Sequence, residues 1–223
     1  MRGIASVVDT RTVRVKICGI TTTDAAVAAA AAGADAIGLV FYSASPRNLA
    51  DLGRARDIAL AAGPLISVVG LFVNPQPAEI EKVLGQVPLS LLQFHGDESE
   101  TFCCSFYRPY LKALRMKPGV DIKAAAVAYS SATGLLLDAY RPGIPGGTGE
   151  VFDWQQIPPS LPRPLVLAGG LTSANVAQAV ATVRPWAVDV SGGVESSPGI
   201  KDTDLIRQFI SRAKAVPISI NHE

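Results

Sequence analysis

Short apolar segments alternate with segments of helical pattern along most of this 223-residue chain. Near-continuous apolar strands separated by helices are typical of a parallel sheet that helices cover. Eight strand–helix units in a chain of this length predict an α/β fold with one closed, eight-stranded parallel (β/α)8 barrel, the TIM barrel. The strands are expected at residues 13–17, 36–41, 66–73, 89–94, 110–114, 133–137, 165–168 and 187–190.

An open doubly wound sheet is the alternative to a closed barrel. It is less favoured because no Gly-x-Gly-x-x-Gly pattern follows the first expected strand. No low-complexity linker divides the chain, which indicates a single domain. We expect the barrel at residues 13–215, a loose N-terminal extension at 1–12 and a C-terminal tail at 216–223.

The composition argues against nucleic-acid and membrane partners. The formal net charge is +1, and Lys and Arg are spread along the chain instead of forming a basic tract. The longest run of small apolar residues, 25–32, is far shorter than the roughly 20 residues that cross a bilayer. Cys18, Cys103 and Cys104 are a poor disulfide framework, so a cytoplasmic location is expected. The chain is expected to act as a monomer or a homodimer.

A cysteine stands at the end of the first expected strand, where barrel enzymes carry their active sites. Because side chains alternate along a strand, Lys16 and Cys18 share one face and Val15 and Ile17 share the other. The apolar face must pack on helices, so Cys18 is expected to point over the barrel axis with Lys16 below it. A nearby ammonium lowers the pKa of a thiol, which favours Cys18 as a base. An ordinary buried cysteine is the alternative.

Asp138 closes another expected strand, directly after three leucines. A carboxyl group beside such apolar surface either needs a hydrogen-bond partner or favours its protonated form. A protonated carboxyl group suits a general acid. The alternative is a loop cap or a partner for a Lys or Arg at a strand end.

Two glycine pairs close the last two expected strands, and they indicate a phosphate site. Gly169 and Gly170 precede an expected helix, while Ser191-Gly192-Gly193-Val194-Glu195 is expected to form one short helical turn. Glycine lets backbone N–H groups approach an anion, and the loops after strands seven and eight often bind phosphate in barrels. Tight turns are the alternative for each pair alone.

Three further polar residues follow strand ends. Arg47, in Ser45-Pro46-Arg47, could bind a carboxylate through its guanidinium fork, and a solvated arginine is the alternative. Gln93 and His95 share one face at the end of the fourth strand and are further candidates for substrate binding, and a histidine with only a structural hydrogen bond is the alternative for His95. His95 and His222 are the only histidines, so no metal site is expected.

Several segments, taken together and in chain order, resemble the phosphoribosylanthranilate isomerase family of tryptophan biosynthesis. These segments are Lys16-Ile17-Cys18-Gly19-Ile20-Thr21, Ser45-Pro46-Arg47, Gln93-Phe94-His95-Gly96-Asp97, Leu136-Leu137-Asp138, Gly146-Gly147-Thr148-Gly149, Phe152-Asp153-Trp154, Leu167-Ala168-Gly169-Gly170-Leu171 and Asp189-Val190-Ser191-Gly192-Gly193-Val194-Glu195. Two positions depart from the family motifs. Phe94 stands where Leu is usual, and Gly192 stands where a second Ser is usual, which calls into question one hydroxyl contact to phosphate.

The resemblance implies a barrel of the ribulose-phosphate-binding type, with no metal and no organic cofactor. It implies a phosphorylated small-molecule substrate and an Amadori rearrangement, from N-(5-phosphoribosyl)anthranilate to 1-(2-carboxyphenylamino)-1-deoxyribulose 5-phosphate. In the family the motif cysteine is the general base and the aspartate of the sixth strand is the general acid, which correspond to Cys18 and Asp138. The motif arginine, Arg47, would face the anthranilate carboxylate.

Two other functions stay open on the sequence. Another phosphosugar aldose–ketose isomerase barrel, of the histidine-pathway type, resembles this chain in reaction but carries an aspartate in place of Cys18. A non-catalytic phosphosugar-binding barrel would keep the region of Gly170 and Gly193 without needing Cys18 and Asp138 together.

Overall fold

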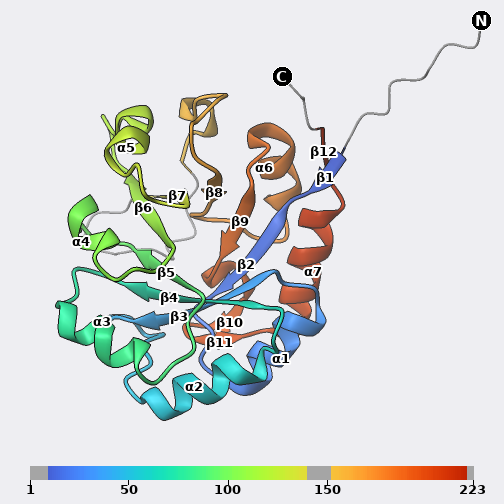
Figure 1. Ribbon diagram of the computed structural model, residues 1–223. Helices are drawn as coiled ribbons and strands as arrows, with labels where there is room; N and C mark the ends of the chain where they lie inside the picture. Colours follow the sequence, from blue (N-terminus) through green and yellow to red (C-terminus); the bar gives the residue numbers. More distant parts are fainter. Residues whose placement is uncertain (1–9, 140–151, 220–223) are drawn as a thin grey trace, which may run out of the picture.

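The computed structural model describes residues 10–139 and 152–219 (Figure 1). Eight parallel strands pair in chain order and close into a barrel, as expected. They are β2 (Arg14–Cys18), β3 (Ala36–Phe41), β4 (Ser67–Phe72), β5 (Leu91–Phe94), β6 (Tyr110–Met116), β7 (Gly134–Ala139), β8 (Leu165–Leu167) and β9 (Ala187–Val190). The last strand closes on the first, with Lys16 opposite Asp189 and Ile17 opposite Val190. The parallel order places all eight carboxyl ends at one mouth.

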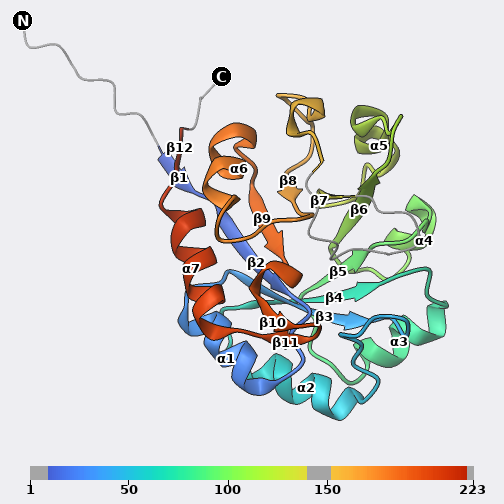
Figure 2. The same cartoon turned by 180° about the vertical axis from the view of Figure 1, so that it is seen from behind.

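Helices surround the barrel in the described residues (Figures 1 and 2). They are α1 (Thr23–Ala31), α2 (Leu52–Ala61), α3 (Pro77–Leu84), α4 (Glu100–Cys104), α5 (Ile122–Ala128), α6 (Val176–Val183) and α7 (Thr203–Lys214). Between β7 and β8 the described residues contain only the 3-10 turn η1 (Trp154–Gln156). The Gly146-Gly147-Thr148-Gly149 segment lies outside the described residues.

Local sequence explains where the helices begin. At α3, Pro77 occupies the first turn, where its missing N–H costs no hydrogen bond, and Glu79 accepts the backbone N–H of Gln76. Ile80 and Val83 of α3 are buried. One side of the helix therefore packs into the core while the start of the helix is capped by its own sequence.

Alternation along β7 separates its leucines from each other. Leu135 and Leu137 pack in a cluster with α5, whereas Leu136 belongs to the cluster inside the barrel. Asp138 follows on the inner face, at the carboxyl end. The same alternation puts Ile17 in the core under the helices and Cys18 in the mouth. Strand geometry alone therefore aims both side chains at the mouth.

The two ends of the described chain meet: of the extension expected at 1–12 and the tail expected at 216–223, the structure describes residues 10–12 and 216–219. The short strands β1 (Thr10–Thr12) and β12 (Pro217–Ser219) pair antiparallel and lie side by side in Figures 1 and 2. The Arg11 guanidinium lies 5.0 Å from the centre of the Trp186 ring. The backbone pairing joins the two segments, and the cation–π contact attaches them to the barrel. The hydrophobicity of the sequence predicts neither contact.

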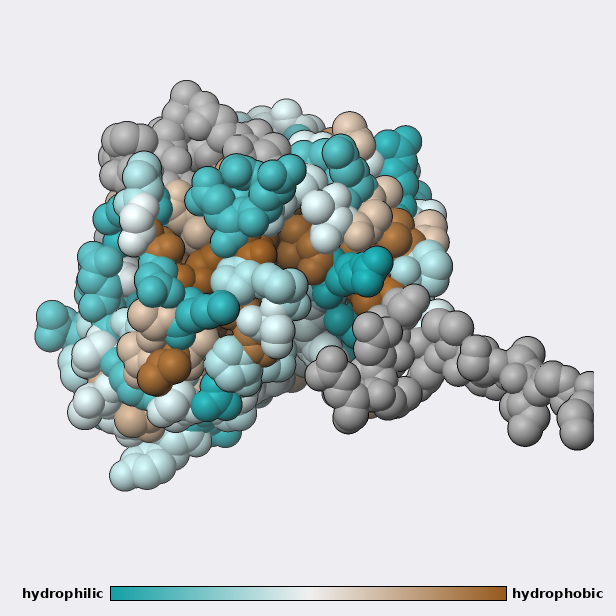
Figure 3. Space-filling view, turned by 90° about the horizontal axis from the view of Figure 1, so that it is seen from above, coloured by the Kyte–Doolittle hydropathy of each residue, from teal (hydrophilic) through white to brown (hydrophobic). Residues whose placement is uncertain are grey.

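The outer surface of the barrel mixes hydrophobic and hydrophilic side chains. On the face shown in Figure 3, hydrophobic residues gather in the middle and hydrophilic residues border them. Within residues 10–139 and 152–219, no helix has the length and apolar character needed to cross a membrane.

Candidate active site

A cavity of about 490 Å³ opens at the carboxyl-end mouth of the barrel. Nine of the ten candidate residues line it: Cys18, Arg47, His95, Asp138, Gly169, Gly170, Ser191, Gly192 and Gly193. The exception is Gln93, which is fully buried and touches the cavity only through His95. The barrel therefore gathers residues that are up to 175 positions apart, from Cys18 to Gly193, around one space.

Cys18 ends β2 with its thiol in the cavity, opposite Gly38 of β3. A Cβ atom at Gly38 would lie 2.7 Å from the Cys18 sulfur and 3.1 Å from the Lys16 Nζ. Both distances are too short for ordinary contact, so only glycine leaves room for these two side chains. The sequence reasoning had not recognised Gly38.

The charge environment of Cys18 differs from the expectation. Lys16 donates to Asp189 Oδ1 across 2.9 Å, and both side chains are buried. Burial works against the Lys16 charge, but the Asp189 carboxylate outweighs it and the pKa of Lys16 is raised. Burial raises the pKa of the Cys18 thiol, and Lys16 offsets this only in part, because Asp189 acts in the opposite direction. The expected lowering of the thiol pKa is therefore wrong.

Arg47 reaches the cavity across the end of β2. Gly19 makes this possible: its φ is +74°, and a Cβ atom there would lie 2.4 Å from Arg47 Cδ. The guanidinium donates from Nε to Glu195 Oε1 across 2.7 Å and from Nη2 to Oε2 across 2.6 Å. These hydrogen bonds raise the pKa of Arg47 above its ordinary value. Arg47 is thus held in place by a carboxylate of the protein itself.

Lys201 joins this pair from the hairpin of β10 (Glu195–Ser197) and β11 (Ile200–Lys201). Its Nζ donates to Glu195 Oε1 across 2.7 Å and to the Ser191 carbonyl across 3.0 Å. Burial acts to raise the pKa of Glu195, but the hydrogen bonds of Arg47 and the charge of Lys201 outweigh it and lower that pKa. Sequence reasoning assigned no role to either residue; the signal for Glu195 was its place in the segment that follows the glycine pair.

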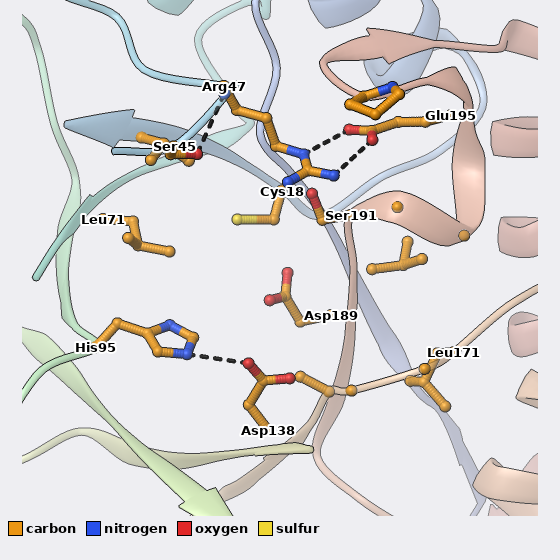
Figure 4. Close-up of a pocket in the computed structure, with 18 of the residues that line it drawn as sticks. Cys18, Ser45, Arg47, Leu71, His95, Asp138, Leu171, Asp189, Ser191 and Glu195 are labelled. Atoms are coloured by element: carbon orange, nitrogen blue, oxygen red, sulfur yellow. Dashed lines mark hydrogen bonds and ion pairs between the residues drawn. The ribbon is translucent and has the colours of Figure 1, made fainter. Parts of the chain in front are cut away.

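Asp138 faces Cys18 from the far side of the cavity (Figure 4). His95 Nε2 lies 3.1 Å from Asp138 Oδ2, and Gln93 Nε2 lies 2.9 Å from His95 Nδ1. All three side chains are buried. Asp138 therefore has the hydrogen-bond partner that its apolar surroundings require, and the partner is a histidine instead of a Lys or Arg.

The loop that carries His95 is anchored by a second buried ion pair. Lys112 donates to Glu98 Oε2 and to the Gly96 carbonyl, each across 2.7 Å. The Glu98 carboxylate also accepts the backbone N–H groups of Asn74 at 2.8 Å and Gly96 at 3.0 Å. This anchor ties the end of β4 to the loop after β5, and the sequence had not suggested it.

The glycine-rich loops after β8 and β9 pack against each other and line the cavity. Gly169 and Gly170 have φ values of +81° and +65°, a region that favours glycine. A Cβ atom at Gly193 would lie 2.0 Å from the Leu171 carbonyl oxygen. The expected short turn is present as the 3-10 turn η2 (Gly192–Val194). Glycine is thus required here by backbone packing, whatever the loops bind.

The described part of the chain contains no cluster of three or more His, Cys, Asp or Glu side chains that could hold a metal ion. The cavity instead offers a thiol, a carboxyl group, an arginine and glycine-rich backbone. Such a set can move protons and bind anions.

Comparison with known proteins identifies relatives of this chain. A family model described as N-(5'phosphoribosyl)anthranilate (PRA) isomerase matches residues 15–212. N-(5'-phosphoribosyl)anthranilate isomerase of Pseudomonas aeruginosa is 59% identical over 203 residues, covering 91% of this chain and 96% of the relative. The enzyme of the same name from Cellvibrio japonicus is 54% identical over 211 residues, covering 95% of this chain and 98% of the relative.

Solved structures give the same result. Phosphoribosyl anthranilate isomerase from Thermotoga maritima aligns with a TM-score of 0.83 and 42% identity, covering 92% of this chain and 100% of the other. A structure of the isomerase in complex with reduced 1-(o-carboxyphenylamino)-1-deoxyribulose 5-phosphate aligns with a TM-score of 0.80 and 40% identity over the same shares. Since the barrel, the cavity and these matches agree along nearly the whole chain, it belongs to the N-(5'-phosphoribosyl)anthranilate isomerase family.

Proposed function

We propose that this chain is an isomerase of tryptophan biosynthesis. It converts N-(5'-phosphoribosyl)anthranilate to 1-(2-carboxyphenylamino)-1-deoxyribulose 5-phosphate by an Amadori rearrangement. One observation carries the proposal: the Cys18 thiol and the Asp138 carboxyl group face one cavity that the two glycine-rich loops also line. A relative with 40% identity is described in complex with a reduced form of this product.

Asp138 acts first, as the general acid. Its proton passes to the furanose ring oxygen as the bond from that oxygen to C1′ breaks, and the nitrogen lone pair forms the C1′=N Schiff base. With the Gln93 amide donating to Nδ1, His95 carries its proton on Nε2 and donates to Asp138 Oδ2. The other oxygen, Oδ1, is then free to carry the acidic proton. Gln93 and His95 orient the acid in this scheme.

Cys18 acts second, as the general base. The thiolate takes the C2′ proton, and the electrons of the C–H bond move toward the positively charged nitrogen to give an enolamine. Tautomerisation of the enolamine gives the ketone. Because burial raises the pKa of Cys18, its thiolate is a minor species at neutral pH but a strong base once formed.

The remaining candidates hold the substrate. Backbone N–H groups around Gly170 and Gly193 bind the phosphate, a role supported by their position in the cavity lining and by the anion binding of loops of this kind. Arg47, which also lines the cavity, binds the anthranilate carboxylate. Two anchors at fixed positions bring the reacting carbons between acid and base, which lowers the entropic cost of reaction.

The setting of this activity follows from the same features. We infer that the enzyme works in the cytoplasm, as a monomer or a homodimer, without metal or organic cofactor. All three cysteines are free, as is usual in a reducing compartment. The enzyme of Thermotoga maritima is described as dimeric.

The decisive experiment follows the anthranilate fluorescence of N-(5'-phosphoribosyl)anthranilate after the protein is added. We expect a decay that depends on enzyme concentration and survives dialysis against EDTA. The Cys18→Ala/Asp138→Asn double variant serves as the control and should leave the fluorescence stable. A wild-type protein that binds the substrate without consuming it would instead support a non-catalytic phosphosugar-binding barrel.

A further inference from the structure

We propose that Glu195 is a positioning residue that aims Arg47 at the substrate carboxylate, and that Lys201 links this arrangement to the phosphate-binding loop. This inference rests on the proposed function, because it assumes that Arg47 receives the anthranilate carboxylate. It deepens that function by assigning roles to two residues that do not react with the substrate.

Arg47 has more N–H donors than its contact with Glu195 uses. A guanidinium has five N–H donors and two edges that can each bind a carboxylate with two parallel hydrogen bonds. Glu195 occupies the edge formed by Nε and Nη2. Among the described residues, no other side chain hydrogen-bonds this guanidinium. The edge formed by Nη1 and Nη2 is therefore left for a second carboxylate.

The contacts of Arg47 set the direction in which its guanidinium points. Figure 4 shows the Arg47 head group lying between Glu195 and Cys18, with Glu195 on the side away from the centre of the cavity. The aliphatic part of Arg47 passes against Gly19, where only glycine leaves space. Contacts from both ends thus restrict the side chain, and the Glu195 contact determines which edge of the guanidinium faces the substrate.

The charges of Arg47, Glu195 and Lys201 do not cancel. Glu195 accepts from both Arg47 and Lys201, so one carboxylate is shared by two cations. The cluster keeps one positive charge in excess, which attracts an anionic substrate group. If Glu195 were balanced by Arg47 alone, the pair would be neutral and would attract a carboxylate less. Lys201 therefore lets Glu195 hold Arg47 without cancelling its charge.

Lys201 connects the pair of Arg47 and Glu195 to the phosphate loop. Lys201 also donates to the carbonyl of Ser191, which directly precedes the glycine pair. Its hairpin is fixed at the other end, where Thr21 Oγ1 donates to the Gly199 carbonyl across 2.7 Å. The hairpin of β10 and β11 thus sets the distance between the two sites that bind the negative groups of the substrate.

The test compares two ligands on the full-length protein by calorimetry. One is reduced 1-(2-carboxyphenylamino)-1-deoxyribulose 5-phosphate, and the other is the same molecule without the ring carboxylate. In Glu195→Gln, the Kd of the carboxylate ligand should rise about 10-fold, because the Arg47 guanidinium no longer points its free edge at the ligand carboxylate. The Kd of the other ligand should stay within about twofold. In an Arg47→Ala background, Glu195→Gln should have no further effect on either ligand. Equal losses for both ligands would make Glu195 a structural residue only and overturn the proposal.

Two further variants serve as controls for this test. Glu195→Gln leaves a buried Lys201 without its carboxylate, so the Glu195→Gln/Lys201→Gln variant provides a charge-balanced version. It should weaken both phosphorylated ligands equally through loss of the Lys201–Ser191 contact, and should show the same additional loss for the carboxylate ligand alone. Asp204→Asn removes a charge from an exposed ion pair and should change neither Kd; a selective loss there would assign the effect to net charge and contradict the proposal. A wild-type protein that binds both ligands with the carboxylate preference but shows no turnover would contradict the proposed function alone.

Discussion

The two halves of the cavity surround their reacting groups with different kinds of neighbours. We call one the base half: Lys16, Cys18, Arg47, Asp189, Glu195 and Lys201. We call the other the acid half: Gln93, His95, Glu98, Lys112 and Asp138. The base half surrounds its thiol with ionised groups, whereas the acid half holds its carboxyl group through a histidine and keeps its ion pair in the loop behind it.

The charges of the base half do not cancel. Three cations, Lys16, Arg47 and Lys201, face two carboxylates, Asp189 and Glu195. One positive charge is left, and an ionised Cys18 would balance it. Burial nevertheless raises the thiol pKa, so the surplus charge moderates the cost of forming a thiolate without removing it.

The acid half works by hydrogen bonds in series. The Lys112–Glu98 pair is itself charge-balanced, and it holds the loop that places His95 beside Asp138. No Lys or Arg among the described residues pairs with Asp138. Cys18, a base that must become an anion, is therefore surrounded by a net positive charge. Asp138, an acid that must give up a proton, is held by a hydrogen-bond donor.

The largest expected effect is at Asp138. Asp138→Asn keeps the size of the side chain but has no acidic proton to donate, so kcat should fall by about 10⁴-fold, the upper end for a general acid. Ring opening precedes the step at Cys18, so adding Cys18→Ala should cost little more. Single-turnover rates of the two single variants and the double variant measure this. A double variant that loses the product of both single effects would show that the halves act independently.

Cys18→Ala is expected to lower kcat by about 10²–10³-fold with little change in KM, because it removes the base but none of the anchors. Circular dichroism should show an intact fold, since the cavity around the thiol already faces solvent on one side. The matched control is Cys103→Ala, which removes a buried thiol outside the cavity. Equal kcat values in both variants would show that Cys18 contributes only to packing.

Breaking the ion pair of the acid half should destabilise the fold more than it affects binding. Lys112→Met removes the cation that pairs with Glu98 at a site where both side chains are only 2% exposed, and the expected loss is about 3 kcal/mol in the free energy of unfolding. Urea unfolding provides the measurement. The Lys112→Met/Glu98→Gln variant should recover part of the loss. An unchanged urea midpoint in Lys112→Met would show that the pair contributes no net stability.

The smallest expected effect is a shift in a titration curve. The rate of Cys18 alkylation by iodoacetamide, measured in a Cys103→Ala/Cys104→Ala background, should rise only above the ordinary pH range of a thiol, because burial raises the Cys18 pKa. Lys16 acts to lower that pKa, so Lys16→Gln should move the curve to still higher pH. Lys123→Gln on the exposed side of α5 should not move it. A shift of the curve to lower pH in Lys16→Gln would show that Lys16 raises the Cys18 pKa, and would contradict the prediction.

The sequence by itself determined the parts that depend on local pattern. Alternation along its strand was enough to predict that Cys18 points into the mouth, and the position of Asp138 at a strand end was enough to place it at the same mouth. Eight apolar segments were enough to predict the closed barrel. The strand-end glycines could be read in the same way, because a backbone that turns sharply at a loop leaves glycine in the sequence.

Only the tertiary structure decided which charged groups meet. Lys16 was expected to act on Cys18, yet its nearest carboxylate is Asp189, 173 positions away, and burial reverses the expected change in the thiol pKa. Arg47 meets Glu195 across 148 positions. Periodicity describes which face of its own strand a side chain occupies. The pKa of a group and the direction of a guanidinium depend instead on the neighbours and the solvent exclusion that appear only when distant strands are brought together.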